Sequence, residues 1–592
     1  MMKESCPKRK EGRKQLKRWF KYIRPYLAFF ILGPLCMIVE VIGEVVMPRL
    51  LSVVINNANA GTLTSGTSLT IMAEMIATAL LMMAGGIGGA YFGSKAAVNF
   101  GADLRADMYK RVQAYSFANI DRFSTGSLVT RLTNDVMQVQ NFVNMLLRMA
   151  LRAPGMMIAA LIMAVSIKPA LSTVFAVSIP ILAVVVGFII RTAHPRFRNM
   201  RKKVDALNTF VQENVTNIRV VKSFVREEHS EKGFRKVNAE LKDAGLSALR
   251  VVIFMQPVMT LLMNIIVLAV VLIGGRIVLS NGMEIGDLSA FITYVTQILV
   301  SLVMVSFILM IASNASAAAD RIKEVLDEKI DLSDEHAAEP ERLVERGEIE
   351  FKNVSFRYYK DSEEKVLNGV SLKIPAGSTV GIIGSTGSGK STLVSMIPRL
   401  YDADEGEVLV DGVNVKDYSL VNLRDGIGMV LQKNTLFSGT VEENLRWGDA
   451  EATDEEVREF ASYAQADSFI RSFKDGYGTM IDQGGTNVSG GQKQRLCIAR
   501  ALLKKPKILI LDDSTSAVDT ATEAEIRKAF RGSLKGSTKI IIAQRISSVM
   551  DADEIIVLNE GEITGTGTHE ELLRTNKEYR EIYESQSGKE AV

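Results

Sequence analysis

One short stretch of the chain has the residue types that bind phosphate groups. It reads GSTGSGKST and comprises Gly384, Ser385, Thr386, Gly387, Ser388, Gly389, Lys390, Ser391 and Thr392. This GxxxxGK[ST] pattern follows the apolar run TVGII and precedes the start of an apolar helix. Its glycines let backbone N–H groups surround a phosphate, and the helix N-terminus adds positive potential. We expect Lys390 to bind the β- and γ-phosphates of a nucleotide, and the Ser391 hydroxyl to bind Mg²⁺.

A second element completes the predicted nucleotide site. After Lys507, the apolar run 508–511 (ILIL) ends in two carboxylates, Asp512 and Asp513. Continuous apolar runs of this length are typical of strands buried in a parallel sheet. A carboxylate at the end of such a strand can bind Mg²⁺, which is the role of the Walker B aspartate, and we expect it of Asp512.

A third motif narrows the class of protein. Residues Val488, Ser489, Gly490, Gly491 and Gln492 form a second glycine-rich turn that opens a helix. A plain P-loop ATPase does not need such a turn. Here the chain resembles the ATP-binding cassette (ABC) transporter family, whose LSGGQ signature contacts ATP bound on the opposite subunit. The resemblance covers nearly the whole chain and implies ATP and Mg²⁺ as cofactors.

The resemblance implies roles for three further places. Tyr358, in SFRYY, is similar to the aromatic residue that stacks on adenine. Gln432, in MVLQKNT, is similar to the glutamine that touches Mg²⁺ and faces the membrane domain. Residues 516–519 (SAVD) resemble the D-loop of the family.

The residues that would carry out hydrolysis depart from the family pattern. Where the family has a glutamate after the Walker B aspartate, this chain has Asp513, whose carboxylate falls roughly 1.5 Å short. Misplacement on that scale costs about 100-fold in rate. Where the family has a switch histidine, this chain has Gln544, which can bind a γ-phosphate but cannot accept a proton. Gln483 also replaces a family glutamate, whereas the signature keeps Ser489, Gly490, Gly491 and Gln492.

Two interpretations of these changes stay open. In one, the substitutions have no consequence. In the other, Lys390, Asp512, Asp513 and Gln544 build a slow, ATP-retaining site, and the intact signature completes a fast site on a partner. That partner would be a second half-exporter with the Walker B glutamate and the switch histidine. The pattern resembles the degenerate-site subunit of heterodimeric bacterial multidrug exporters.

The rest of the 592-residue chain must position this site. The net charge of +3 excludes a bulk polyanion binder, so we expect no nucleic-acid partner. Three scattered cysteines and four histidines argue against a disulfide framework and against a Cys/His metal site. The hydrophobic content of 47% and the mean hydropathy of +0.14 average two unlike halves, a membrane domain and a soluble domain.

Six apolar spans lie in the first half of the chain. Four are uncharged runs near or above the roughly 20 residues that cross a bilayer, and two are weaker. They are 75–94, 169–190, 251–275 and 288–319, with 25–46 and 153–167 as the weaker pair. A secretory signal is excluded for the first span, because five more follow it.

Lysine and arginine predict the orientation of these spans. Ten of them lie between Lys3 and Arg24, and fourteen lie in 191–250, whereas 53–70 has none. By the positive-inside rule both chain ends are cytoplasmic, in a multi-pass protein of the plasma membrane that fits a bacterium.

The predicted fold is a membrane α-helical domain of six transmembrane helices with long cytoplasmic extensions, followed by an α/β P-loop ABC nucleotide-binding domain. The predicted parts are a basic N-terminal segment, a transmembrane domain, a linker and the nucleotide-binding domain, at 1–24, 25–320, 321–347 and 348–592. The inward segments read as helix, and less regular patches at 120–136 and 212–224 mark their bends. These bends look like the coupling helices of the family.

The sequence indicates least about the transported substrate. Of 26 methionines, 22 precede residue 321, which suits a pliable cavity or ordinary packing. Glu40 and Glu44 lie one turn apart at membrane depth, where ionisable groups face a cavity or a partner. They either attract cationic amphiphiles or pair with Arg49 or a neighbouring helix. We expect hydrophobic or amphiphilic small molecules as cargo; a lipid flippase and an ATP-gated membrane sensor are the alternatives.

Overall fold

The computed structural model describes residues 18–335, 337–360, 362–514, 518–533 and 536–587. Most of the predicted basic segment 1–24, up to residue 17, therefore lies outside the described residues. Contacts divide the chain into two compact units. The first holds the residues up to Gln113 together with Thr125–Asp327, and the second holds Ala114–Ser124 and everything from Glu328 onward.

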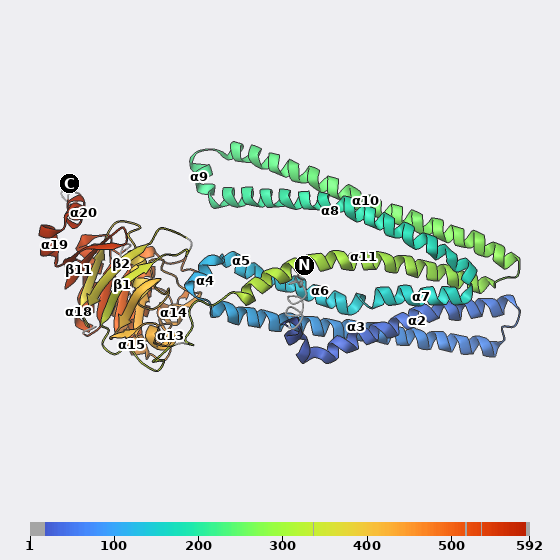
Figure 1. The fold of residues 1–592 in the computed structure, drawn as a ribbon, viewed down its shortest axis with the longest axis horizontal. Helices are drawn as coiled ribbons and strands as arrows, with labels where there is room; N and C mark the ends of the chain where they lie inside the picture. Colours follow the sequence, from blue (N-terminus) through green and yellow to red (C-terminus); the bar gives the residue numbers. More distant parts are fainter. Residues whose placement is uncertain (1–17, 336, 361, 515–517, 534–535, 588–592) are drawn as a thin grey trace, which may run out of the picture. The chain divides into compact units, whose positions relative to one another are not determined.

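Helices build the first unit (Figure 1). A short 3-10 turn, η1 (Arg24–Tyr26), precedes them. The helices are α2 (Leu27–Asn59), α3 (Ser65–Gln113), α5 (Thr125–Thr130), the π-helical turn η2 (Arg131–Asp135), α6 (Val136–Met149), α7 (Arg152–Ile167), α8 (Pro169–Thr216), α9 (Ile218–Ser223), α10 (Glu227–Leu279) and α11 (Ile285–Asp327). Within the described residues, six helical stretches are long and apolar enough to cross a membrane, which confirms the six predicted spans.

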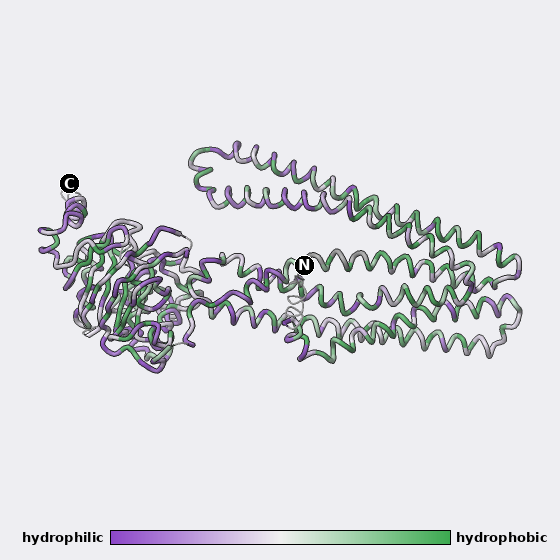
Figure 2. The backbone as a smooth tube through the Cα atoms, in the orientation of Figure 1, coloured by the Kyte–Doolittle hydropathy of each residue, from purple (hydrophilic) through white to green (hydrophobic). Residues whose placement is uncertain are grey.

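The helices continue well beyond the length that a bilayer needs. Helix α8 has 48 residues, or about 72 Å at 1.5 Å per residue, against about 30 Å of hydrocarbon. Figure 2 shows that α8 and α10, which run side by side, are apolar at one end and hydrophilic toward α9. The inward segments are therefore helical extensions of the apolar spans.

The chain turns back after α3 earlier than the predicted bend at 120–136. The turn carries a short helix, α4 (Phe117–Arg122). A reciprocal capping box opens it: the Asn119 N–H donates to Ser116 Oγ, and the Ser116 N–H donates to Asn119 Oδ1. Helix α4 thus overlaps the beginning of the predicted bend at 120–136, and its capping box, SFAN, lies just before that bend.

The remainder of the predicted bend is helical, with a π-helical turn at η2. Here Asp135 is buried, and Arg321 on α11 donates to both of its carboxylate oxygens, at 2.7 and 2.5 Å. Packing against α11 thus overrides the weak helix preference of the Ser, Thr and Gly residues in this stretch. The second predicted bend, 212–224, contains α9.

The predicted linker 321–347 is shorter in the structure, because both of its ends belong to the two units. Helix α11 runs through Asp327, and Glu324 pairs with Arg131 at 2.8 Å. At the other end, the backbone N–H groups of Glu345 and Arg346 donate to Asp411 of the second unit at 2.7 and 3.0 Å.

Glycines allow α2 and α3 to pack closely. A Cβ at Gly85 would lie 2.8 Å from the Cys36 carbonyl oxygen, so a larger residue would force the helices apart. Small residues at such positions are typical of helix pairs in membranes.

The apolar side chains around α9 remain outside the packing of the first unit. No residue of α9 is buried, and Phe224 and Val225, which follow it, are 72% and 80% exposed.

The second unit is an α/β domain with a mixed sheet, an antiparallel sheet and a small β7–β8 pair. The mixed sheet has the order β12-β11-β3-β10-β9-β6 and is parallel except for β12. Its strands are β3 (Thr379–Ile383), β6 (Ile427–Val430), β9 (Ile508–Asp512), β10 (Thr538–Ile542), β11 (Glu554–Asn559) and β12 (Glu562–Gly567). Strands β9 and β10 are buried along their whole length, as their apolar runs predict.

The antiparallel sheet has the order β2-β1-β4-β5. Its strands and the small pair are β1 (Ile349–Phe356), β2 (Leu367–Ile374), β4 (Glu405–Val410), β5 (Val413–Asn414), β7 (Gly439–Thr440) and β8 (Met480–Ile481). The helices are α12 (Lys390–Ser395), α13 (Leu420–Asp425), α14 (Val441–Leu445), α15 (Asp454–Tyr463), α16 (Asp467–Ser472), α17 (Gly490–Leu503), α18 (Thr520–Ser533), α19 (His569–Thr575) and α20 (Lys577–Ser587), with 3-10 turns η3 (Gly476–Gly478) and η4 (Ile546–Ser548). The described part of the chain therefore has the predicted fold class, six apolar helices followed by an α/β domain.

Candidate functional site

The order of the mixed sheet brings the predicted phosphate-binding and acidic motifs to one edge. Strand β10 lies between β3 and β9, and all three are parallel, so their carboxyl ends share one edge. The phosphate loop follows β3, Gln544 follows β10, and Asp513 follows β9. Ligands of open α/β sheets bind outside these carboxyl ends.

The phosphate loop has the backbone conformation that its glycines permit. Gly387 and Gly389 have φ values of +86° and +95°, which side chains other than hydrogen rarely allow. The Lys390 ammonium donates to the carbonyl oxygens of Gly384 and Ser385 at 2.9 and 2.7 Å. Burial lowers the pKa of Lys390 below its ordinary value, and the nearby Asp512 charge opposes that shift. These bonds hold the Lys390 ammonium inside the phosphate loop, where it would contact the phosphates of a bound nucleotide.

The oxygen atoms predicted to hold Mg²⁺ converge. The Ser391 hydroxyl donates to Asp512 Oδ1 at 2.9 Å, and Asp512 is 4% exposed. Burial raises the pKa of Asp512, and the bond from Ser391 opposes that rise. A buried carboxylate beside a hydroxyl fits Mg²⁺, which prefers oxygen ligands. Ser391 and Asp512, with Gln432 close to the same acidic pair, would hold the ion, which neutralises phosphate charge when bound.

The two positions predicted to depart from the family pattern, Asp513 and Gln544, are in direct contact. Gln544 Nε2 donates to Asp513 Oδ2 at 2.7 Å. Burial raises the pKa of Asp513, while hydrogen bonds from Gln544 and Gln432 oppose that rise. Asp513 also has a φ of +46°, an uncommon conformation for a residue with a side chain. Since an amide cannot accept a proton, Gln544 holds the Asp513 carboxylate but cannot relay a proton to or from it.

Tyr358 is tied to the phosphate-binding helix at one end and exposed elsewhere. Its hydroxyl lies 2.9 Å from Thr392 Oγ1, and the residue is 46% exposed. The ring is edge-on to Phe356 and Tyr401, with centroids 5.1 and 5.3 Å apart. An aromatic face held in this way could stack on adenine.

Replacing Tyr358 by alanine should weaken ATP binding to this chain about tenfold, because stacking of a base on an aromatic side chain contributes about 1–3 kcal/mol. Tyr358→Phe keeps the ring and loses only the contact with Thr392, so we expect its affinity for ATP to change less than threefold. Equilibrium titration of the full chain with a fluorescent ATP analogue measures both affinities. Equal affinity of the alanine variant and the parent would contradict the stacking role.

Tyr401 is a residue that sequence reasoning missed. Its hydroxyl donates to Asp121 Oδ2 of α4 at 2.7 Å, and its ring is edge-on to Phe117. Burial and the Asp121 carboxylate raise the pKa of Tyr401 above its ordinary value. The two bonded residues are 280 positions apart, so no local pattern could have revealed the contact. Tyr401 thus lies between the predicted adenine contact and the first short turn helix.

The signature motif opens α17 with its polar groups satisfied. The Gln492 N–H donates to Ser489 Oγ at 3.3 Å, and the Ser489 N–H donates to Gln492 Oε1 at 2.9 Å. Ser489 and Gly490 are exposed, whereas Val488 packs partly against the core. The helix N-terminus therefore presents an exposed backbone and positive potential to solvent, which suits an anion supplied from outside this chain.

The remaining predicted motifs are the D-loop, residues 516–519, and Gln483. Residues 515–517, which include the start of the predicted D-loop, lie outside the described residues. Asp519 caps α18 by accepting from the Thr522 N–H at 3.0 Å. Gln483 lies in an exposed turn.

Glu40 and Glu44 share one arginine in the first unit. Arg152 on α7 lies 3.1 Å from Glu40 Oε1 and donates to Glu44 Oε1 at 2.6 Å. Arg49 instead pairs with Asp287 at 2.5 Å. Of the two pairings expected from the sequence, the structure has the one with a neighbouring helix. Glu44 and Arg152 also line a pocket of about 260 Å³ with Met156, Gln297 and Met304.

Arg152→Gln should lower the free energy of unfolding by about 3 kcal/mol. Without the arginine, Glu40 and Glu44 remain as unpaired charges in the apolar interior of the first unit. Arg148→Gln removes an exposed arginine nearby and should have little effect. Adding Glu40→Gln and Glu44→Gln to the Arg152 variant should recover most of the loss. Thermal unfolding of the purified variants in one detergent compares them, and an Arg152 variant as stable as the parent would exclude the structural role.

Known proteins are similar to this chain over almost its whole length. The sequence pattern of the ABC transporter transmembrane region matches residues 30–302, and that of the ABC transporter ATP-binding region matches 367–516. YfiB of Bacillus subtilis, an uncharacterised ABC transporter ATP-binding protein, is 38% identical over 97% of this chain and 99% of its own. YgaD of Bacillus subtilis, provisionally named a multidrug export ATP-binding/permease protein, is 33% identical over 97% of this chain and 99% of its own. The solved structure of a bacterial Atm1-family ABC exporter with ATP bound aligns with a TM-score of 0.76 and 25% identity, over 96% of this chain and 98% of the other.

Proposed function

This chain belongs to the ABC transporter family, and from that premise we propose that it is one half of a heterodimeric exporter of hydrophobic or amphiphilic small molecules. It combines a multi-pass membrane region with one ATP-binding domain. In the proposal, it lies in a bacterial plasma membrane with both ends in the cytoplasm, as the distribution of lysine and arginine predicts.

The observation that carries the proposal is the bond between Gln544 and Asp513. Two changes relative to the family meet at one contact, so they act on the same chemical step. A carboxylate that is one methylene short and held by an amide is a poor activator of water. We therefore propose that Lys390, Ser391 and Asp512 bind ATP and Mg²⁺ at this chain's site, which hydrolyses slowly.

The partner in this proposal is a second half-exporter with the Walker B glutamate and the switch histidine. The signature of this chain, opened by Ser489 with its N–H groups exposed, would complete the partner's fast site. ATP binding would bring the two cassettes together and turn the membrane domains outward, and hydrolysis at the partner's site would reset them.

The proposed cargo class rests on the 260 Å³ pocket of the first unit. Flexible methionines, Met156 and Met304, lie beside charged Glu44 and Arg152. A pocket with both soft apolar and charged groups suits amphiphiles of varied shape. The provisional multidrug assignment of YgaD supports the same class.

The test compares the purified chain with the same chain co-expressed with such a partner, both reconstituted in liposomes. We expect the pair to hydrolyse ATP and amphiphilic compounds to stimulate this hydrolysis. Transporters inserted inside-out in the liposomes should also move a dye into them when ATP is supplied. The chain alone should bind ATP and hydrolyse it at least 50-fold more slowly, since its site lacks a correctly placed base. Fast hydrolysis by the chain alone would contradict the heterodimer, and a fluorescent phospholipid as the only transported compound would identify a flippase.

A further inference from the structure

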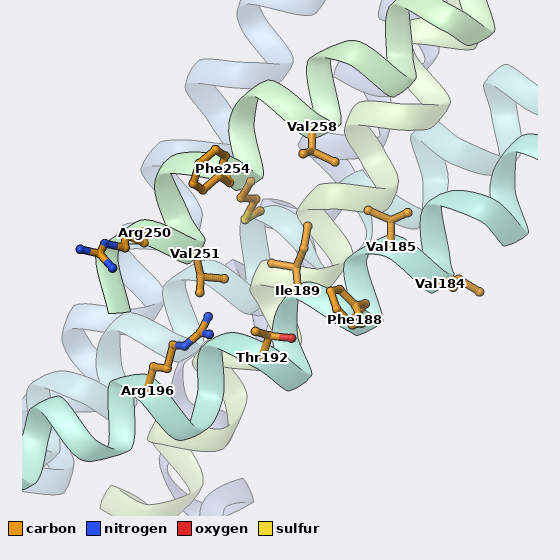
Figure 3. A pocket seen from close by; sticks show the side chains of 11 residues that line it. Val184, Val185, Phe188, Ile189, Thr192, Arg196, Arg250, Val251, Phe254 and Val258 are labelled. Atoms are coloured by element: carbon orange, nitrogen blue, oxygen red, sulfur yellow. The ribbon is translucent and has the colours of Figure 1, made fainter. Parts of the chain in front are cut away.

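A long groove lies between α8 and α10 of the first unit (Figure 3). It has a volume of about 650 Å³, and its walls are almost entirely apolar. Val184 and Val258 lie toward one end, and Phe188 and Phe254 line the middle. Phe188 is 69% exposed and Phe254 is 67% exposed, so both rings are available to a molecule in the groove.

The other end of the groove carries two arginines. Figure 3 shows Arg196 on α8 and Arg250 on α10 at the end of the groove away from Val184. Lys203, farther along α8, pairs with Glu240, whereas the described part of the chain offers Arg196 and Arg250 no ion-pair partner within 4 Å. Both guanidinium groups are exposed. They are therefore free to bind an anion supplied from outside.

The arginines lie at the border of the apolar spans. On α8 the uncharged run 169–190 ends just before this region, and on α10 the uncharged run 251–275 begins directly after Arg250. Residues 191–203 contain six lysines and arginines and no acidic residue. In a membrane, this places the charged end of the groove at the level of the lipid headgroups and the apolar part among the acyl chains.

We propose that the groove binds an acidic phospholipid of the surrounding bilayer, with an acyl chain along Phe188 and Phe254 and the phosphate between Arg196 and Arg250. Guanidinium groups match phosphate oxygens in geometry and charge, and remain charged at every physiological pH. The acyl chain packs along the exposed rings of Phe188 and Phe254. The site is separate from the ATP site and from the pocket beside Glu44, so the transporter carries a structural lipid in addition to its cargo.

The test uses a tryptophan placed in the groove. The chain has two tryptophans, Trp19 and Trp447, which are replaced by phenylalanine, and Phe188→Trp supplies the reporter. Quenching by brominated phosphatidylglycerol and by brominated phosphatidylcholine is measured in mixed micelles, without nucleotide or cargo. Each arginine contributes about fivefold to binding of an acidic lipid, so we expect a preference of about 30-fold for phosphatidylglycerol.

Two double variants with the same loss of charge decide the assignment. Arg196→Gln with Arg250→Gln should reduce the preference to near unity. Arg198→Gln with Arg201→Gln removes two exposed arginines that do not line the groove and should leave the preference within about twofold of the parent. Unchanged ATP binding in every variant shows that each has folded.

Three results would overturn the proposal. They are equal quenching by both lipids in the parent reporter, an equal effect of the two double variants, and no quenching by either lipid. The last would mean that another subunit's helices fill the groove. Because neither ATP nor cargo is present, none of these results depends on the proposed export function.

Discussion

Joint replacement of Asp513 by glutamate and of Gln544 by histidine raises ATP hydrolysis by the purified chain about 100-fold, and by more than the product of the two single changes. The glutamate places its carboxylate about 1.5 Å farther forward, where it can polarise water. The histidine can donate a hydrogen bond to the carboxylate, as Gln544 now does to Asp513, and can also carry a proton. Residues that share a contact in one chemical step are expected to show such non-additivity.

The single variants provide the controls for this gain. Asp513→Glu alone should raise the rate of ATP hydrolysis less than tenfold. Gln544 Nε2 already lies 2.7 Å from the Asp513 carboxylate, so the longer glutamate side chain would run into Gln544. Gln544→His alone should change little, since the carboxylate remains short. Lys390→Ala in the double variant should return the rate to background. Full activity from Asp513→Glu alone would show that Gln544 is irrelevant.

Gly490→Asp in the signature of this chain lowers hydrolysis by the assembled pair at least 100-fold. Asp513→Asn in the same chain changes it less than threefold. The aspartate puts a negative charge at the helix N-terminus that would face the partner's ATP, where positive potential is needed. The same aspartate favours the start of α17, so the variant folds. Steady-state ATPase activity of the co-purified pair measures both variants.

Gly478→Asp is the matched control for the signature variant. A Cβ at Gly478 would meet nothing within 4 Å, and the residue lies outside the signature. It should leave the activity of the pair unchanged. If Asp513→Asn reduced activity as much as Gly490→Asp, the two ATP sites would be equivalent and the asymmetric mechanism would be wrong.

The chemistry of the ATP site could be predicted because its residues are local in sequence. The phosphate loop, the strand ending in Asp512 and the turn at Ser489 are each defined within ten residues, and parallel strand order brings the phosphate loop and Asp512 to one edge of the sheet. The six spans could be predicted because apolar length alone separates a membrane helix from other helices.

Contacts between distant residues could not be predicted. Tyr401 bonds to Asp121, and Arg152 to Glu44, across 280 and 108 positions, and no local spacing encodes either pair. The helical structure of most of the predicted bend at 120–136 has a related cause. Its Ser, Thr and Gly residues favour a loop locally, yet packing of Asp135 on Arg321 makes the segment helical.

If the proposed partner covers the exposed apolar residues at α9, the survival of this subunit would depend on the supply of that partner. Phe224 and Val225 present to water the kind of surface that chaperones and proteases recognise on unfolded chains. A copy made in excess of its partner keeps that surface uncovered. In the proposed heterodimer its stability would then follow mass action, so the amount of transporter in the cell would be set by the scarcer of the two gene products.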